Sequence, residues 1–331
     1  MPTKDTAQTA NLAIGDICVS IESSCPQVLE HVRERYRDFL SSAPPDFRIE
    51  MTVLEDADPA EFLGVPRGML ADFVTREART QVSPCTRTPP AYHRCGVAAG
   101  QESGAARPTG KDSFLRSKPK VSHLDHRILF QRTDFAGCMD MKACQGRSIF
   151  TENMRSIAIE SFLRICYSFL AVEHEGLLLH SAGVMRGQNG YIFPGQSGTG
   201  KSTIAGLASD REVILSDEMV VVRKTGEDHV VYSSPFFGTN KSAERSLSAS
   251  LKAAFLPIKD RDVYVDRAKP ARALPKLMAG VLFFGQDPAL NRRLMDICNG
   301  VVERIPFYDL HFRRDATFWQ CIDELENKGG P

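Results

Sequence analysis

The chain lacks both a long apolar run and a net charge. Its longest apolar runs, such as "VLFFG" from Val281 and "GLLLH" from Gly176, fall far short of the ~20 residues that a membrane-spanning helix requires. The 41 basic residues (Lys and Arg) equal the 41 acidic residues (Asp and Glu), so no general attraction to nucleic acid or to an anionic membrane follows. We therefore expect neither a membrane span nor a nucleic-acid partner.

The sequence also lacks the marks of secretion and of a disulfide framework. The N-terminus "MPTKDTAQTANLAIGDICV" has neither a basic start nor a continuous apolar region, so no signal peptide is visible. The nine cysteines are odd in number and irregularly spaced, which favours reduced thiols, most of them small core residues. We expect a cytoplasmic protein.

Histidine and cysteine occur without a convincing metal-binding pattern. Cys85, His93 and Cys95 are loosely spaced, as are His123 and His126, and no second pair of matching type accompanies them. A structural zinc site is therefore a weak alternative.

What the sequence does contain is enough apolar material for two domains. A chain of 331 residues with 42% hydrophobic and 25% charged residues is typical of a globular protein with real cores. Near the N-terminus the pattern predicts a strand ("LAIGDICVSI"), a helix around "QVLEHVRERYRDFL" and, after Pro44 and Pro45, a second strand ("FRIEMTVLE"). We expect a small α/β recognition domain over residues 1–150 and a second domain over 151–331.

A basic segment between about residues 84 and 120 interrupts the first of these domains. It is rich in Pro, Gly, Ser and Arg, has almost no apolar periodicity, and carries seven basic residues against Glu102 and Asp112. Such a stretch is typical of a flexible linker or lid. It is interpreted first as a solvated loop, and alternatively as an arm that guides an acidic or phosphorylated partner.

Further strands and helices are expected on either side of the centre of the chain. "HRILFQRTDF" and the segment ending in "GRSIF" predict two short strands, and a core helix should run from about Glu152 to Glu173. Near the C-terminus, "IPFYDLHFRRDATFWQCIDEL" predicts a strand and a helix with Trp319 as a packing anchor. The residues expected on the apolar side of the core helix are Ile157, Ile159, Phe162, Leu163, Ile165, Cys166, Phe169 and Leu170.

A phosphate-binding loop of Walker A type stands out in the second domain. The segment "GQSGTGKS" satisfies G-x-x-x-x-G-K-[ST], follows the strand-like "GYIFP" and precedes the helical "STIAGLA". Its glycines allow backbone N–H groups to surround phosphate, Lys201 adds a positive charge, and the Ser202 hydroxyl can bind Mg²⁺. The predicted nucleotide-binding residues are Gly195, Gln196, Ser197, Gly198, Thr199, Gly200, Lys201, Ser202 and Thr203.

The residues before this loop predict a β-hairpin. "GVMRGQNGYIF" contains Asn189-Gly190, the pair that a type I′ turn favours. The loop's strand would then have an antiparallel neighbour, unlike the all-parallel cores of GTPases and motor ATPases. Counting back from the turn places His180 and Ser181 near the start of the loop, so His180 is a candidate catalytic residue, with a structural role as the alternative.

An acidic pair follows the loop after a short helix. "REVILSDEMVVVRK" predicts a strand that contains Asp217 and Glu218. Asp217 would hold Mg²⁺, and one of the two carboxylates could take a proton from an attacking hydroxyl. Neighbouring strand residues point to opposite faces, so both can serve one site only at a strand end or a bulge. Glu218 could instead be a solvated carboxylate.

A basic residue near the transferred phosphate is also expected. The Ser-rich "SSPFFGTNKSAERSLSASL" offers Lys241 and Arg245, either of which could stabilise negative charge there. The alternative for both is a solvated loop charge.

Together, "HSAGV", "YIFPGQSGTGKST" and "VILSDEMV" resemble the catalytic core of the HPr kinase/phosphorylase superfamily, which shares its fold with ATP-dependent phosphoenolpyruvate carboxykinase. The resemblance covers about Leu177 to Arg223, and its continuation through Phe307 to Trp319 is similar to HPr kinase-related proteins of peptide-modification gene clusters. It implies a mixed-sheet P-loop kinase core. The roles it implies are the site histidine for His180, phosphate and Mg²⁺ ligands for Lys201 and Ser202, a metal ligand or base for Asp217, and the second acidic residue for Glu218.

Departures from these families narrow the expected reaction. Gln196 stands where HPr kinase has an aspartate, Thr203 replaces a glutamate, and no Arg-Gly-Leu-Gly segment for phosphorolysis is present. HPr itself is therefore not expected as the acceptor. The chain is also too short for a carboxykinase, and its N-terminal half has no recognisable organic-acid site.

The sequence thus predicts an ATP- and Mg²⁺-dependent kinase that phosphorylates a hydroxyl, expected to be a serine of a peptide or small protein. A small-molecule kinase and a non-catalytic ATP-binding sensor are the alternatives. The sequence leaves a homo-oligomer open.

Overall fold

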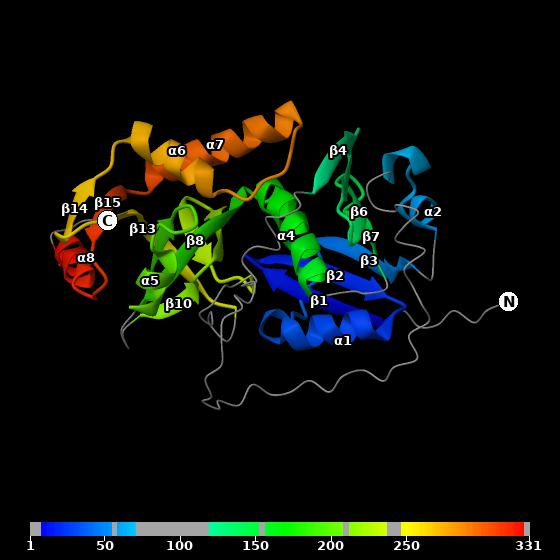
Figure 1. Cartoon of the computed structure of the whole chain (residues 1–331), viewed down its shortest axis with the longest axis horizontal. Helices are drawn as coiled ribbons and strands as arrows, with labels where there is room; N and C mark the ends of the chain where they lie inside the picture. Colours follow the sequence, from blue (N-terminus) through cyan, green and yellow to red (C-terminus); the bar gives the residue numbers. More distant parts are fainter. Residues whose placement is uncertain are drawn as a thin grey trace, which may run out of the picture.

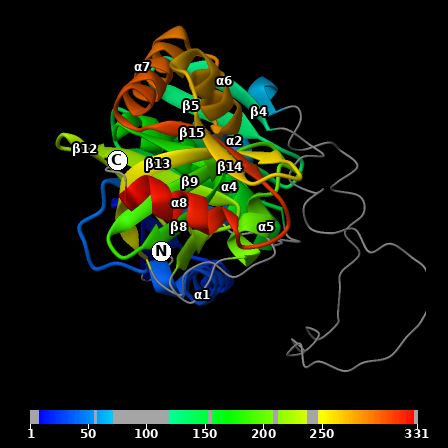
Figure 2. The ribbon, with the colours of Figure 1, turned by 90° about the vertical axis from the view of Figure 1, so that its left-hand side faces the viewer.

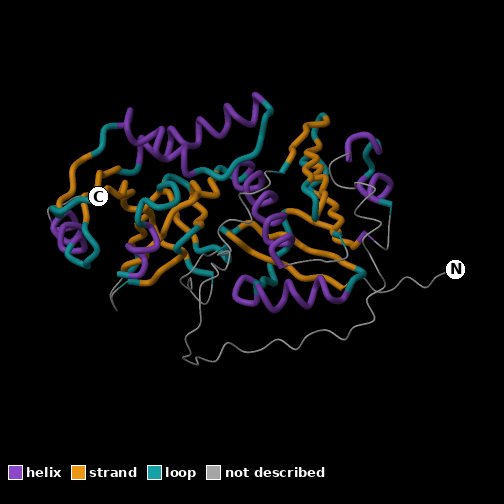
Figure 3. The backbone as a smooth tube through the Cα atoms, in the orientation of Figure 1, coloured by secondary structure: helices purple, strands orange, loops and turns teal. Residues whose placement is uncertain are grey.

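The chain folds into two mixed β-sheets with a helix between them. The computed structural model describes residues 8–54, 58–70, 119–151, 156–207, 212–236 and 246–327. One sheet is built before and the other after helix α4 (Ser156–Glu173), which lies between the two groups of strands (Figures 1 and 3). The predicted α/β class is confirmed. The basic segment lies outside the described residues, apart from its last two positions.

The N-terminal sheet contains seven strands and follows one continuous path. β2 and β3 are parallel and are joined through helix α1 (Pro26–Arg35), which confirms the predicted strand-helix-strand unit. The β3–β7 pair is also parallel, and the other pairs are antiparallel. In spatial order the strands are β1 (Gln8–Ile14), β2 (Ile17–Ser23), β3 (Phe47–Val53), β7 (Gln145–Phe150), β6 (Phe135–Asp140), β5 (Arg127–Gln131) and β4 (Lys120–Leu124).

Several strand predictions in this half were too coarse. The single strand predicted over "LAIGDICVSI" is a hairpin of β1 and β2, because Gly15 and Asp16 form its turn with φ values of +64° and +54°. Positive φ at both turn residues is the type I′ geometry that fits strand twist. Likewise, the two strands predicted before residue 151 are three, β5, β6 and β7, joined by tight turns.

Helices cover both faces of the N-terminal sheet. The short helix α2 (Pro59–Leu63) begins at Asp58, whose Oδ1 accepts hydrogen bonds from the backbone N–H groups of Ala60 (3.0 Å) and Glu61 (3.1 Å). Leu63 of α2 joins a small core with Leu129 and Ile149. The opposite face packs against α4, and Figure 1 shows α1 along the edge formed by β1 and β2. Two 3₁₀ turns complete this half, η1 (Arg37–Phe39) and η3 (Arg67–Leu70).

The C-terminal sheet closes on itself. β8 pairs with β11, β11 with β12, β12 with β13, β13 with β9, and β9 with β8, so five strands form a complete circuit. The β9–β13 and β13–β15 pairs are parallel and the rest are antiparallel. The strands are β8 (Gly176–Arg186), β9 (Asn189–Pro194), β10 (Val213–Ser216), β11 (Met219–Thr225), β12 (Asp228–Tyr232), β13 (Ser248–Lys259), β14 (Tyr264–Arg267) and β15 (Phe307–Phe312).

Two helix pairs cover the two faces of the C-terminal sheet. α6 (Pro270–Gly280) and α7 (Pro288–Arg304) pack on one face. α5 (Lys201–Gly206) and α8 (Phe318–Asn327) pack on the other, and Figure 2 shows α8 in front of the strands with α6 and α7 above them. Trp319 of α8 lies in the core between this second helix pair and the sheet and is only 5% exposed, so the predicted packing anchor is confirmed.

Helix α4 joins the two sheets into one body. Its apolar residues belong to a single core that contains side chains of both sheets. The Tyr167 hydroxyl donates to the Leu12 carbonyl (2.9 Å), and Arg223 of β11 donates to the Gly15 carbonyl (2.6 Å). The predicted boundary near residue 150 coincides with the end of β7, but the division into two domains stays a prediction.

The described part of the predicted core helix, Ser156–Glu173, is confirmed with one correction of detail. Ile157, predicted on the apolar side, is 42% exposed. Despite its apolar character, neither α4 nor any other helix in the described ranges is long and apolar enough to cross a membrane.

Candidate phosphate-binding site

The Walker A segment forms a loop between β9 and α5. Gly198 (φ +87°) and Gly200 (φ +111°) adopt left-handed backbone conformations that side chains disfavour. A Cβ atom on Gly200 would also come within 2.5 Å of Phe312 Cζ. Glycine is therefore required at the second position both by the backbone turn and by its contact with β15.

Lys201 lies inside this loop. Its Nζ donates hydrogen bonds to the carbonyl oxygens of Gly195 (2.7 Å) and Gln196 (2.9 Å), and the residue is only 5% exposed. The Thr199 hydroxyl donates to the same Gln196 carbonyl (2.9 Å). The loop is thus closed around a buried ammonium group, an arrangement that can place positive charge against a phosphate.

The predicted hairpin before the loop exists, but its turn lies two residues earlier. β8 and β9 are antiparallel, with Arg186 opposite Asn189, so Gly187 and Gln188 form the turn in place of Asn189-Gly190. Gly187 supplies the positive φ (+60°) that a two-residue hairpin turn requires.

His180 lies where the sequence placed it, at the start of the phosphate loop. Ser181 pairs with Pro194, and the Gly195 N–H donates to the His180 carbonyl (3.4 Å). The neighbouring side chains on its face of β8, Leu178 and Ala182, belong to the cores under α4 and α5 respectively. His180 is therefore at the junction of these two helices; a catalytic role stays a prediction.

The acidic pair lies at an irregularity between β10 and β11. Both strands run antiparallel to β8, and the register of β10 on β8 shifts by one residue between Ile214 and Ser216, just before the acidic pair. Asp217 and Glu218 occupy the gap between the strands. The Ser216 hydroxyl accepts the N–H groups of Glu218 (3.2 Å) and Met219 (3.0 Å), which stabilises the bend. The single strand predicted over this segment is therefore two strands, β10 and β11, and the acidic pair lies between their ends.

The start of the loop, His180 and the acidic pair lie side by side at the same height across three neighbouring strands, which we call their common level. The Ser181 N–H donates to the Glu218 carbonyl (3.0 Å) on one side, while Ser181 pairs with Pro194 on the other. Two strand spacings, ~10 Å, therefore separate the acidic backbone from the start of the loop. That separation suits groups that act from opposite sides on one bound phosphate.

The two carboxylates differ in their surroundings. Asp217 is 2% exposed. The Glu218 carboxylate accepts a hydrogen bond from Arg164 of α4 (3.1 Å), and its side chain is 28% exposed. Sequence reasoning did not identify Arg164, because a single arginine among the apolar residues of a helix carries no motif.

A cavity of about 200 Å³ adjoins the loop at Thr203 and was also missed. Phe312, which contacts Gly200, forms part of its wall. The Asp260 carboxylate accepts a hydrogen bond from Nδ1 of the His311 ring (2.8 Å), and this bond lowers the pKa of the Asp260 carboxyl. The basic pair in "HFRRD" was the available signal. The lining residues are Thr203, Lys259, Asp260, Phe312, Arg313 and Arg314.

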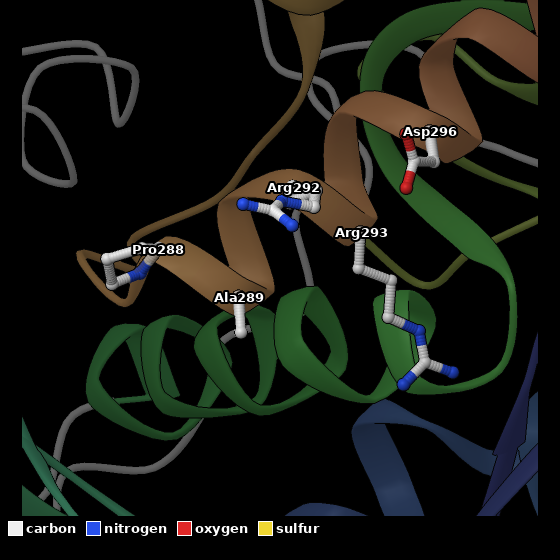
Figure 4. A pocket seen from close by; sticks show the side chains of 5 residues that line it. All are labelled: Pro288, Ala289, Arg292, Arg293 and Asp296. Carbon is white, nitrogen blue, oxygen red and sulfur yellow. The ribbon is translucent and has the colours of Figure 1, made fainter.

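A second hollow, of about 400 Å³, lies along α7 (Figure 4). Its lining residues are Pro288, Ala289, Arg292, Arg293 and Asp296. None of these belongs to the phosphate loop, the acidic pair or the residues around them. This hollow therefore takes no part in the candidate site.

Two predicted features are the basic residue near the transferred phosphate and the metal site. Arg245 and its alternative Lys241 lie outside the described residues. Within the described ranges, no group of three or more His, Cys, Asp or Glu side chains is arranged to hold a metal ion. A metal at Asp217 would therefore depend on Ser202 and bound phosphate for its other ligands, which is typical of Mg²⁺.

Comparison with known proteins adds no assignment. No protein-family model matches the chain, and no curated protein sequence matches it either. The residues of the site and their arrangement are therefore the basis for a function.

Proposed function

We propose that this protein is an ATP-dependent kinase that transfers the γ-phosphoryl group to a hydroxyl, with a serine of a peptide or small protein as the acceptor. The observation that carries the proposal is the common level of three elements across adjacent strands. These are the loop that encloses Lys201, the β8 segment with His180, and the bend with Asp217. A phosphate-binding loop, a cation and a carboxylate are the parts that phosphoryl transfer requires.

The roles follow from this arrangement. The loop N–H groups and Lys201 bind the phosphates, and Asp217, with His180 nearby, orients the acceptor hydroxyl. The oxygen of the acceptor hydroxyl forms a bond to the γ-phosphorus while the bond between that phosphorus and the bridging oxygen of ADP breaks. The hydroxyl proton passes to the Asp217 carboxylate. Stabilisation of the charge on the transferring group comes mainly from positioned donors.

Ser202 and Asp217 fit a magnesium site of the kind kinases use. A hydroxyl and a buried carboxylate are both hard oxygen ligands, and neither belongs to a closed cage of protein ligands. Bound there with nucleotide, Mg²⁺ would neutralise negative charge on the phosphates.

The cavity beside Thr203 supports a nucleoside at the far end of the phosphates. Thr203 follows directly on Ser202, so the space it lines adjoins the end of the loop. Arg313 and Arg314 offer flat guanidinium groups on which a base can stack. The peptide acceptor depends on the resemblance to kinases of peptide-modification clusters, and a metabolite acceptor is the competing outcome.

The test is transfer from γ-labelled ATP into an extract of the native host, separated into protein, peptide and small-molecule fractions. Asp217→Asn protein should lose the label, while Asp266→Asn, at an exposed position of β14, should keep it. Label confined to small molecules would replace the peptide acceptor with a metabolite. Tight ATP binding with no label anywhere would contradict the kinase and favour a nucleotide sensor.

A further inference from the structure

A line of alternating charges runs from the N-terminal half to the acidic bend. Arg35 of α1 pairs with Glu160 of α4 (3.2 Å), Glu160 pairs with Arg164 (2.7 Å), and Arg164 pairs with Glu218 (3.1 Å). The two positive and two negative charges balance. The line therefore connects three elements without leaving a net charge in their interface.

Arg164 is the most buried member of this line. Its side chain is 8% exposed, and its guanidinium lies over the Phe236 ring at 5.5 Å from the ring centre. Burial of a guanidinium requires carboxylate partners, and Arg164 has one on each side, Glu160 and Glu218. The position of Glu218 is consequently set by α4.

Glu218 is also held at both ends of its backbone. Its N–H donates to the Ser216 hydroxyl (3.2 Å), and its carbonyl accepts from the Ser181 N–H (3.0 Å). With the Arg164 ion pair, three attachments hold this one residue. Asp217 lies between Ser216 and Glu218, so those attachments limit where its backbone can lie.

We propose that Arg164 and Glu218 form a positioning pair that holds Asp217 for its metal ligand role, and that Glu218 is not the second acid-base group. This inference rests on the proposed function of Asp217. It divides the acidic pair into one residue that acts on the ligand and one that is an anchor to the helix. It also makes α4, the helix between the two sheets, part of the site.

The experiment measures the Mg²⁺ concentration that half-saturates binding of a non-hydrolysable ATP analogue to the whole chain, by titration calorimetry. Arg164→Met, Glu218→Gln and the double variant should each raise that concentration by about 10-fold, and the double variant should be no worse than either single one, because all three break the same pair. Glu218→Gln changes few atoms, so it provides the test if Arg164→Met fails to fold.

Arg293→Met is the matched control. Arg293 of α7 (Figure 4) pairs with Glu173 at the other end of α4 (2.8 Å), far along the helix from the acidic bend. The control should lower thermal stability without changing the Mg²⁺ requirement. A merely structural role for Arg164 predicts that same result for Arg164→Met.

The outcomes separate this inference from the proposed function. An unchanged Mg²⁺ requirement in Glu218→Gln, or effects of the two single variants that add in the double variant, would overturn the positioning pair. Wild-type protein that binds the analogue with Mg²⁺ but transfers no phosphate would overturn the kinase alone, since the binding measurement tests the pair without turnover.

Discussion

The two sheets of this protein differ in regularity. In the N-terminal sheet every described strand pair keeps one continuous register. In the C-terminal sheet the register shifts twice, between Ile214 and Ser216 and between Leu251 and Ala253. The candidate site residues lie at or beside interruptions of the second sheet.

The difference shows how a sheet can bring consecutive residues to one place. A regular strand alternates its side chains between two packed faces, so consecutive residues cannot meet one ligand. The bend at Asp217 and the loop after Pro194 break that alternation at the same level of the sheet. Each interruption adds local backbone groups that the strands do not use, and such groups can contact phosphate.

The largest expected effect comes from Lys201 in the irregular sheet. Lys201→Met removes the ammonium group inside the loop and should lower the rate of phosphate transfer by about 10²–10³-fold or more. The rate is measured with labelled ATP, and folding is monitored by circular dichroism. Lys276→Met, at an exposed position of α6, is the control and should retain the wild-type rate. An equal loss of transfer rate in both variants would contradict a specific role for Lys201.

A core substitution in the regular sheet should affect stability but not chemistry. Ile149 is fully buried in the small core under α2, and Ile149→Ala should lower the free energy of unfolding by about 2–5 kcal/mol. Urea denaturation measures this loss. The affinity for nucleotide per folded molecule should stay constant. A weaker affinity would mean that the regular sheet also shapes the site.

Alanine substitutions at two loop glycines distinguish the cost of backbone strain from the cost of a steric clash. Gly198→Ala introduces strain alone, because nothing lies within 4 Å of the added atom, and should cost about 1–2 kcal/mol. Gly200→Ala adds the clash with Phe312 and should cost more and weaken nucleotide binding further. Thermal unfolding and calorimetric titration measure the two effects. Phe312→Ala should relieve part of the Gly200→Ala defect; if it does not, the contact with β15 does not define the loop.

The smallest expected effect is on how the stability of the protein depends on pH, through His229 of β12. Burial, with a further contribution from Lys224, lowers the pKa of His229. The unfolded chain therefore binds a proton more readily than the folded one, so stability falls as the pH drops below the unfolded pKa of about 6.5. Thermal melts between pH 8 and pH 5 should show a flatter dependence for His229→Gln. An unchanged slope would assign the acid sensitivity to other groups, such as His31 and His174, whose pKa values burial also lowers.

Local patterns predicted much of this structure because their causes are local. The loop pattern, the strand before it and the final helix with Trp319 were all predicted from neighbouring residues. The failures were also local, as at Gly15-Asp16 and Gly187-Gln188, where more than one turn position was compatible with the residues. Arg164 could not be found this way, since its partner Glu218 is 54 residues distant.

The sequence by itself determined the shape of the glycine-rich loop, because glycine and lysine at fixed spacing specify a backbone shape over a few residues. It also determined that acidic residues follow the loop. The tertiary structure decided which residues surround them, because hydrogen bonding across β8, β9 and β11 aligns segments that are distant in the chain. It also decided that Glu218 pairs with Arg164 of α4, since only the packing of a helix between two sheets brings that guanidinium to the acidic bend.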